Sequence, residues 1–343
     1  MRALAWLISV FWLSSLVDSG GARPSPSVAD LAPLPVRPPE VRVETTERVL
    51  LVVLDGARWQ DVYGDPASMP TLHRWMAEGV ALGAPGVGEP ISASGPNFVS
   101  LPGYTELLTG RTSSCTSNEC GPSPDPTVMD EARRTGAVAV VSSWESIANV
   151  VAHLGASSFV SCGRRPALGA YDDATRKLLD EGAPASPWPG QGDFRPDRLT
   201  AELALHVLEA RGPRLMFLGL GETDEYAHHG DREGYLAALR FDDQVLARID
   251  DTLRRTGNYA RTTIIVTADH GRADGFREHG RAWPESSRIW LVAKGGAVPA
   301  RGYVASPVAR RLADVAPTIR QLLGLPGVPA PGAGAPLGEL GAP

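Results

Sequence analysis

The sequence predicts an α/β domain with a mostly parallel central sheet and helices on both faces, and three observations support this fold class. Apolar runs of strand length alternate with amphipathic runs of helix length. The run at 215–220 is apolar throughout, as in strands that are covered on both faces. Acidic residues and histidines follow three of the strands directly, at the edge where open parallel sheets bind ligands.

The expected elements follow one another in regular order from residue 48 to residue 324. Strand-like runs lie at 48–55, 137–143, 157–162, 214–220, 261–269 and 287–296. Helical runs lie at 69–79, 100–110, 127–136, 144–155, 197–212, 232–257 and 308–324. Strand and helix in turn imply parallel strands joined by helical crossovers. The segment 171–195 is too irregular for a core element, which makes it a candidate lid or rim of a site.

Length and composition indicate one large domain or two smaller ones, since the chain has 343 residues, of which 43% are hydrophobic and 21% charged. We expect a single core at 47–325. A Pro-rich linker is expected at 23–46 and a Pro/Gly/Ala-rich tail at 326–343. The net charge of -6, with no block of like charge, argues against nucleic acid as a bulk binding partner.

The first 22 residues have the layout of a secretory signal peptide: one basic residue, a short apolar run and then small residues. We therefore expect an exported protein, periplasmic or secreted. The alternative is an uncleaved N-terminal anchor, and no other stable membrane partner is expected. Oligomeric state cannot be derived from the sequence.

Three cysteines are present, and two of them are close in sequence. Cys115 and Cys120 lie five positions apart in a polar loop, so they could pair in an oxidising compartment. Cys162 follows a strand-like run and is expected to be a buried thiol. Three unpaired thiols remain the alternative, because spacing does not fix connectivity.

Carboxylates and imidazoles gather at the expected strand ends. Asp55 ends the first strand, Asp224 and His228 follow the run at 214–220, Asp269 and His270 end the run at 261–269, and His279 comes nine residues later. Together these groups are the ligand set of zinc and its neighbours. We expect a metal site, although an acidic residue at a strand end is more often a helix cap.

Ser100 begins the expected helix at 100–110, with Pro102 in its first turn. It could be an N-cap, and the same position would let it act as a nucleophile, because free N–H groups and the positive helix end would face an incoming anion. A serine hydroxyl close to divalent metals also loses its proton more readily than in water.

In pattern and motif order the chain resembles the alkaline phosphatase superfamily, nearest to its nucleotide pyrophosphatase/phosphodiesterase branch. The motifs are "VVLDGAR", "SLPGYTELLTG", "TDEYAHHG", "ADHG" with "EHG", and "LADVAPTIRQLLG". The resemblance implies two divalent metals, with zinc expected and manganese or iron as alternatives. It implies one metal on Asp224, His228 and His279, and the other on Asp55, Asp269, His270 and the Ser100 oxygen.

The resemblance further implies a phosphoester hydrolase that acts on a small-molecule substrate through a phosphoseryl intermediate on Ser100. Gly103 stands where this branch commonly has an asparagine, and Tyr104 stands where sulfatases need an arginine. We expect phosphodiesters to be preferred, unless Arg111 or Arg195 enters the site. Alternatives are a phosphomonoesterase or phosphonate hydrolase and, in another class, a binding protein without turnover. A mutase is less expected, because no large domain is inserted before Asp224.

Overall fold

The computed structural model describes residues 44–327 and 332–341, which belong to one compact unit. The predicted signal peptide at 1–22 and almost all of the predicted linker at 23–46 lie outside the described residues. Among the helices of the described residues, none is long and apolar enough to cross a membrane.

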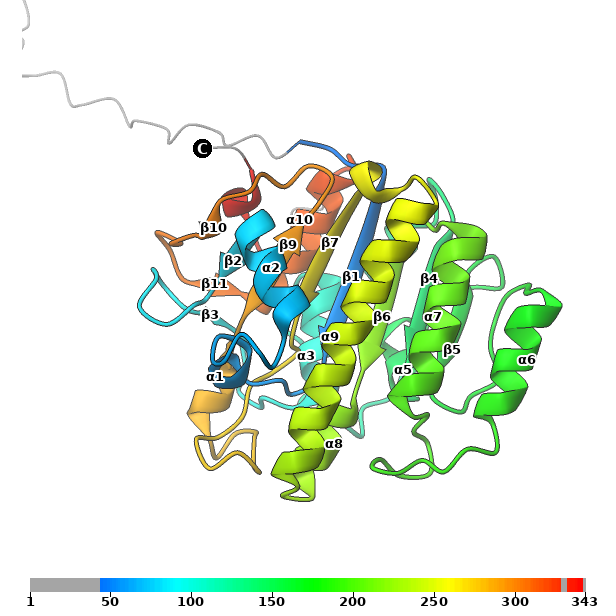
Figure 1. The fold of residues 1–343 in the computed structure, drawn as a ribbon, viewed down its shortest axis with the longest axis horizontal. Coiled ribbons are helices and arrows are strands. Elements are labelled where there is room, and N and C mark those ends of the chain that lie inside the picture. Colours follow the sequence, from blue (N-terminus) through cyan, green and yellow to red (C-terminus); the bar gives the residue numbers. More distant parts are fainter. Residues whose placement is uncertain (1–43, 328–331, 342–343) are drawn as a thin grey trace, which may run out of the picture. The chain divides into compact units, whose positions relative to one another are not determined.

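The centre of the fold is an eight-stranded sheet in the order β10-β2-β9-β7-β1-β6-β4-β5 (Figure 1). Its strands are β1 (Arg48–Leu54), β2 (Val80–Leu82), β4 (Val138–Ser142), β5 (Phe159–Cys162), β6 (Leu215–Leu220), β7 (Thr262–Thr267), β9 (Leu291–Lys294) and β10 (Gly302–Tyr303). Strand β1 pairs in parallel with both β6 and β7, and all three are almost fully buried. The predicted fold class is therefore confirmed.

Helices cover both faces of this sheet (Figure 1). One face carries α2 (Pro70–Glu78), α7 (Asp197–Arg211) and α9 (Arg232–Arg255), and α6 (Asp173–Gly182) packs against α7. The other face carries α3 (Ser100–Thr109), α4 (Val128–Ala132), α5 (Ile147–Val150) and α10 (Val315–Leu322). Two further helices, α1 (Trp59–Val62) and α8 (Glu222–His228), follow the ends of β1 and β6. Short 3-10 turns lie at Tyr259–Arg261, Pro284–Ser287, Leu312–Asp314 and Gly338–Leu340.

The structure adds features that the sequence pattern did not predict. Strand β9 runs antiparallel to β7 and β2. A second sheet has the order β11-β3-β8, from β3 (Ile91–Ser92), β8 (Arg288–Ile289) and β11 (Arg310–Arg311). The helix expected at 144–155 is only the four residues of α5, whereas the segment 171–195 contains α6.

Residues 332–341, in the segment expected to be a tail, pack on the core. Leu337 and Leu340 are fully buried. The Glu339 carboxylate accepts hydrogen bonds from the Arg310 guanidinium at 2.8 Å and from the Ser306 hydroxyl at 2.5 Å. Two leucine side chains and one ion pair therefore hold a segment whose composition resembles a linker.

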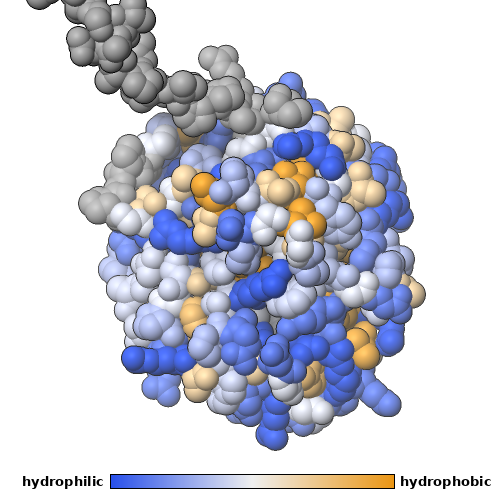
Figure 2. Space-filling view, turned by 90° about the vertical axis from the view of Figure 1, so that its left-hand side faces the viewer, coloured by the Kyte–Doolittle hydropathy of each residue, from blue (hydrophilic) through white to orange (hydrophobic). Residues whose placement is uncertain are grey.

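On the face shown in Figure 2, hydrophobic residues lie in small groups separated by hydrophilic ones. Scattered apolar residues of this kind are usual on the surface of a folded domain.

Strand register brings the candidate site residues to one edge of the sheet. Leu54 is level with Leu220, and Val53 is level with Thr267. Because these strands are parallel, the residues that follow them leave the sheet at the same edge. The segments after β1, β6 and β7 must therefore meet.

Candidate metal centre

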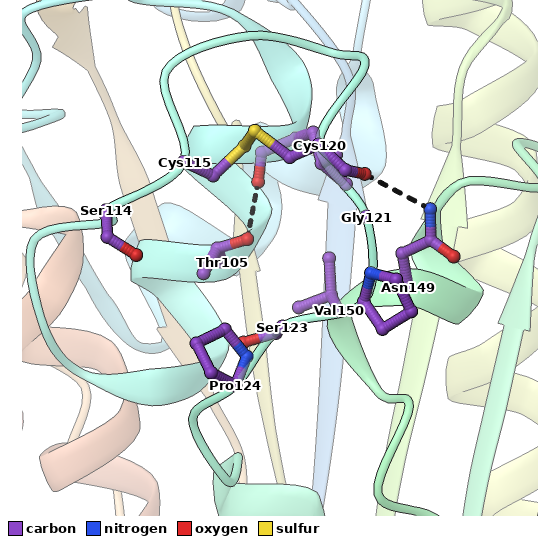
Figure 3. A pocket seen from close by; sticks show the side chains of 11 residues that line it. Thr105, Ser114, Cys115, Cys120, Gly121, Ser123, Pro124, Asn149 and Val150 are labelled. Carbon is purple, nitrogen blue, oxygen red and sulfur yellow. Dashed lines mark hydrogen bonds between the residues drawn. A yellow bond between two sulfur atoms is a disulfide. The ribbon is translucent and has the colours of Figure 1, made fainter.

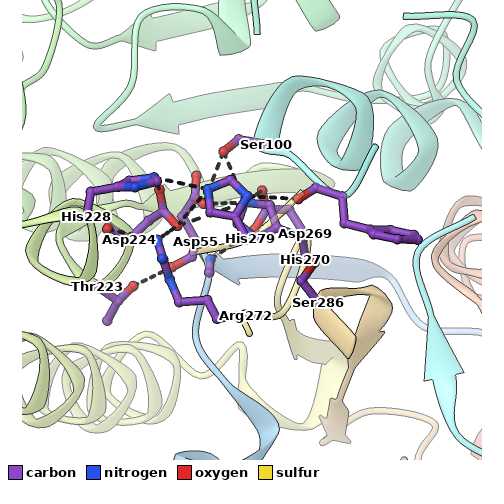
Figure 4. A network of polar contacts seen from close by, with 12 residues as sticks. Asp55, Ser100, Thr223, Asp224, His228, Asp269, His270, Arg272, His279 and Ser286 are labelled. Carbon is purple, nitrogen blue, oxygen red and sulfur yellow. Dashed lines mark hydrogen bonds and ion pairs between the residues drawn. The ribbon is translucent and has the colours of Figure 1, made fainter. Parts of the chain in front are cut away.

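All seven predicted site residues lie together beyond the ends of β1, β6 and β7 (Figure 4). His270 is at the centre of the cluster and is fully buried. Its Nε2 lies 3.2 Å from Ser100 Oγ, 3.5 Å from Asp55 Oδ1 and 3.5 Å from Asp269 Oδ2. The convergence predicted from strand ends is thus present in the folded chain, over sequence separations of more than 200 residues.

Asp224, His228 and His279 form one group of donor atoms. Asp224 and His228 are four residues apart on α8, so they share a helix face, and His228 Nε2 lies 2.9 Å from Asp224 Oδ2. His279 arrives from a distant loop and brings its Nε2 to 3.0 Å from that of His228. Three donor atoms therefore point at one another, as the ligands of a cation do.

Backbone carbonyls fix which ring nitrogen of two histidines carries the proton. His270 Nδ1 lies 2.9 Å from the Gly271 carbonyl, and His279 Nδ1 lies 2.8 Å from the Phe98 carbonyl. Only a protonated Nδ1 can donate to a carbonyl, so each neutral ring directs its Nε2 lone pair into the cluster. Burial lowers the pKa of both His270 and His279, which favours the neutral rings that bind metals.

Three buried carboxylates share the site, and their charges are only partly balanced. Burial and the neighbouring Asp269 raise the pKa of Asp55, and burial and Asp224 raise the pKa of Asp269 to about 8. Burial also opposes ionisation of Asp224, but the Arg272 guanidinium and the two nearby histidines hold its pKa well below the usual value. A site built in this way favours the binding of further positive charge.

One buried carboxylate oxygen indicates that the donor set suits a metal ion. Asp269 Oδ2 is fully buried and has no hydrogen-bond partner among the described residues, although it lies 3.5 Å from a histidine nitrogen. A buried carboxylate oxygen without a partner is costly unless something binds it. Carboxylate oxygens and imidazole nitrogens together fit zinc, manganese or iron, so the residues present suit a divalent ion.

The start of α3 differs from the anion-binding end that was expected. The Leu101 N–H donates to Asn118 Oδ1 at 2.9 Å, Pro102 has no N–H, and the Gly103 N–H donates to the Val99 carbonyl. Three of the first helix positions therefore offer no free backbone donor, because a loop side chain and the first helical bond already use them. The exposed Asn118 thus contacts the residue that follows Ser100, through its side-chain oxygen.

A disulfide closes the loop that carries Asn118. Cys115 and Cys120 are joined (Figure 3), which decides between the two alternatives that the sequence left open. Cys162 is a buried free thiol, as expected. The two bonded cysteines line a cavity of about 220 Å³ together with Leu101 and Thr105 of α3. The loop is thereby fixed against the first turns of the helix that begins with Ser100.

Gly103 has a packing role, in addition to lacking the side-chain donor that an asparagine would supply. A Cβ at this position would lie 2.4 Å from the backbone oxygen of Asp269. The glycine therefore lets α3 approach the segment that carries two candidate ligands. The Cβ of an asparagine at 103 would collide with that backbone, so Gly103→Asn should lower turnover.

Two further residues of the site were missed in the sequence. The buried Tyr104 hydroxyl donates to Asp55 Oδ2 at 3.0 Å, which fixes that carboxylate against α3. Arg272 is 1% exposed and donates to the Asp224 carboxylate. A tyrosine one turn into a helix and an arginine two positions after a histidine carry no local signal of these contacts.

Two residues of the segment 171–195 lie next to His229, which adjoins the candidate ligand His228, whereas α6 of the same segment packs against α7. His229 directly follows His228 in the chain. Trp188 stacks on the His229 ring with a centroid distance of 4.5 Å, and His229 Nε2 lies 2.9 Å from the Pro189 carbonyl oxygen. Arg195 does not enter the site, because its guanidinium is buried against Ser142, Ser161 and Thr200. Arg111 pairs with Asp125 at 3.7 Å.

Part of the chain is similar to known protein families. Residues 191–327 match the family model of the Metalloenzyme superfamily. The chain is 29% identical over 147 residues to the 2,3-bisphosphoglycerate-independent phosphoglycerate mutase of Cereibacter sphaeroides (strain ATCC 17025 / ATH 2.4.3), a match that covers 41% of this chain and 27% of that protein. The chain therefore spans about a quarter of the length of the curated relatives it matches.

Solved structures show the same fold. Alkaline phosphatase PafA superposes with a TM-score of 0.60 at 13% identity, covering 88% of this chain and 100% of that one. Murine ectonucleotide pyrophosphatase/phosphodiesterase 5 superposes with a TM-score of 0.58 at 14% identity, covering 84% and 97%. These superpositions confirm the fold that the resemblance to the alkaline phosphatase superfamily implies, and the family-model match at 191–327 indicates a metalloenzyme segment.

Proposed function

We propose that this chain is a metal-dependent phosphoester hydrolase that uses Ser100 as its nucleophile and prefers phosphodiesters. The position of the Ser100 hydroxyl carries the proposal. Its oxygen lies 3.2 Å from His270 Nε2 and 3.4 Å from Asp55 Oδ1, at the start of a helix. A hydroxyl held among carboxylate and imidazole groups can give up its proton as it attacks.

The donor atoms form two overlapping groups, Asp224 with His228 and His279, and Asp55 with Asp224 and His270, which supports a proposal of two ions. Asp224, His228 and His279 would hold one, and Asp55, Asp269, His270 and the Ser100 oxygen would hold the other. When bound, two divalent ions would supply positive charge to the attacking and leaving oxygens of an in-line displacement. Zinc is the metal we propose, with manganese and iron as alternatives.

The residues of the chain perform the remaining tasks. Ser100 Oγ loses its proton and attacks phosphorus, the bond from phosphorus to the leaving oxygen breaks, and the leaving oxygen takes up a proton and departs as an alcohol. Ser100 then carries the rest of the diester as a phosphoseryl ester. Water attacks phosphorus, the bond from phosphorus to Ser100 Oγ breaks, and the serine hydroxyl and a phosphate monoester are released. Tyr104 holds Asp55 toward the nucleophile throughout, and the Gly271 carbonyl keeps His270 Nε2 unprotonated.

The proposed preference for diesters rests on the arginines considered for the site, which are already bound to other groups. A monoester brings one more charged oxygen than a diester, so it depends more on positive groups beyond the metals. Arg195 and Arg111 are engaged elsewhere, and Arg272 is bound to Asp224. With these cations engaged, a diester, which brings fewer charged oxygens, is the better fit.

The direct test is turnover by wild type and by Ser100→Ala. The purified, metal-assayed protein is given a diester, a monoester, a phosphonate and a sulfate ester with one common leaving group. The wild type should hydrolyse the diester fastest, and Ser100→Ala should lose several orders of magnitude in kcat with its metal content unchanged. No turnover of any substrate would favour a binding protein, and full activity of the variant would make water the attacking group.

The similarity to mutases raises phosphoryl transfer as a second candidate. The described residues between Ser100 and Asp224 form core elements, from α3 to α8, and no separate domain for a second substrate. We therefore propose water as the acceptor. Transfer of labelled phosphate to an added alcohol in preference to water would support the transferase instead.

We also propose export from the cytoplasm. The first 22 residues have the pattern of a signal peptide, and the Cys115–Cys120 disulfide suits an oxidising compartment. Expression in a bacterial host with a C-terminal tag tests this. A shortened, periplasmic product is expected, whereas a full-length product in the membrane fraction would indicate an anchor.

A further inference from the structure

The Arg272 guanidinium connects two separate parts of the candidate metal centre. Its Nη2 donates to the Asp224 carboxylate and, at 3.0 Å, to the Asp224 backbone carbonyl (Figure 4). Its Nη1 donates at 2.5 Å to the Arg277 carbonyl and lies 3.5 Å from the Phe276 carbonyl. One buried side chain therefore holds both a ligand on α8 and the loop that ends at His279.

The loop between Arg272 and His279 has an uncommon backbone conformation. Phe276 adopts a φ of 77°, in the left-handed region that a bulky residue rarely adopts. Its ring packs edge-on against Tyr235 at 4.9 Å, while its carbonyl faces the Arg272 guanidinium. His279 follows three residues later, so Arg272 contacts the chain directly before this candidate ligand, whose own ring contacts the Phe98 carbonyl.

We propose that Arg272 is a positioning residue for the group formed by Asp224, His228 and His279. This inference rests on the metal centre of the proposed function. The bond from Arg272 fixes one oxygen of Asp224 and leaves the other directed at His228 Nε2, 2.9 Å away. Mutation of a residue that hydrogen-bonds to a metal-ligating carboxylate typically lowers the metal affinity by about 10- to 100-fold.

Arg272 has an alternative role, in which it would lower the metal affinity of the Asp224 group. A guanidinium beside Asp224 could compete with a metal ion for the same carboxylate, because both are cations. In that case removal of Arg272 would strengthen metal binding at this group. The sign of the change in affinity therefore separates the two roles.

The experiment is a titration of metal-free protein with Co²⁺, followed by calorimetry and by the visible absorption of the bound ion. Wild type should show two binding steps. His279→Ala should remove the step of the Asp224 group, and His270→Ala the other, which assigns them. Arg272→Met should weaken the first step by about 10- to 100-fold and alter its absorption, while the second step changes less than threefold.

Arg195→Met is the matched control. Arg195 is also buried, at 4% exposure, and is held by a backbone carbonyl and hydroxyls away from the ligands. It should leave both Co²⁺ steps unchanged, so a shared loss in both variants would mean a general structural effect and would overturn the proposal.

Arg272→Lys completes the series, because it keeps the charge but cannot span the carboxylate and the loop carbonyls at once. Its affinity should lie between those of wild type and Arg272→Met, and it decides the question if the methionine variant does not fold. Unchanged or stronger binding in the decisive variant would overturn the positioning role. Absence of any Co²⁺ binding by wild type would instead refute the metal centre of the proposed function, which is a distinct failure.

Discussion

Replacing Gly103 with alanine should damage the site far more than it damages the fold. An added Cβ would lie 2.4 Å from the Asp269 carbonyl oxygen and 3.2 Å from the Asp269 Cβ. Ordinary contact begins near 3.4 Å, so α3 and the segment after β7 must separate by about 1 Å. That segment carries Asp269 and His270, and α3 carries Ser100.

The two contributions to stability partly cancel. Overpacking typically costs about 1–3 kcal/mol, whereas alanine in place of glycine within a helix gains about 1 kcal/mol. The net loss in the free energy of unfolding should be about 0–2 kcal/mol. A displacement of about 1 Å between catalytic groups costs roughly 100-fold in rate, so kcat should fall by about that factor.

Three measurements on Gly103→Ala check the expectation: denaturant unfolding, metal content and diester turnover. Gly155→Ala is the control, since a Cβ there would meet nothing within 4 Å and should leave all three unchanged. Wild-type turnover with full metal content in Gly103→Ala would refute the close contact between α3 and Asp269 on which the reasoning depends.

Further predictions concern metal, the disulfide loop and pH. Chelation should abolish activity, zinc or manganese should restore it, and His270→Ala should lose metal by elemental analysis; full activity of metal-free protein would contradict the centre. Asn118→Ala removes the acceptor of the Leu101 N–H at the start of α3, so it should lower the free energy of unfolding by about 1 kcal/mol, and unchanged denaturant unfolding would show that the loop does not hold this helix end. Cys115→Ser should lower stability by about 2 kcal/mol for so short a loop and also lower kcat; an unchanged kcat would show that the loop needs no closure. Burial, followed by the charge of Asp197, raises the pKa of Glu222 from 4.5 to about 7. Between pH 4.5 and pH 7 the folded state therefore binds more protons at Glu222 than the unfolded state does. Stability should therefore fall as pH rises from 4.5 to 7, and Glu222→Gln should reduce that slope in unfolding curves measured across this pH range.

The sequence by itself determined the strands that form the centre of the sheet and the donors at their ends. Runs such as that of β6 are apolar at every position because both faces are covered, and this is a local pattern. The four-residue spacing of Asp224 and His228 places them on one face of a helix, which is also local. The rule that ligands gather beyond the carboxyl ends of parallel strands then brought these donors to one place.

Only the tertiary structure decided which atoms face one another and what holds them. Tyr104 contacts Asp55 across 49 residues, Asn118 contacts the start of α3 across 17, and Arg272 contacts Asp224 across 48. Gly103 acts through the backbone of a segment more than 160 residues away. Local periodicity predicts which face of a helix or strand is buried. It does not predict which other element that face contacts, because a contact with a distant part of the chain is selected by packing of the whole domain.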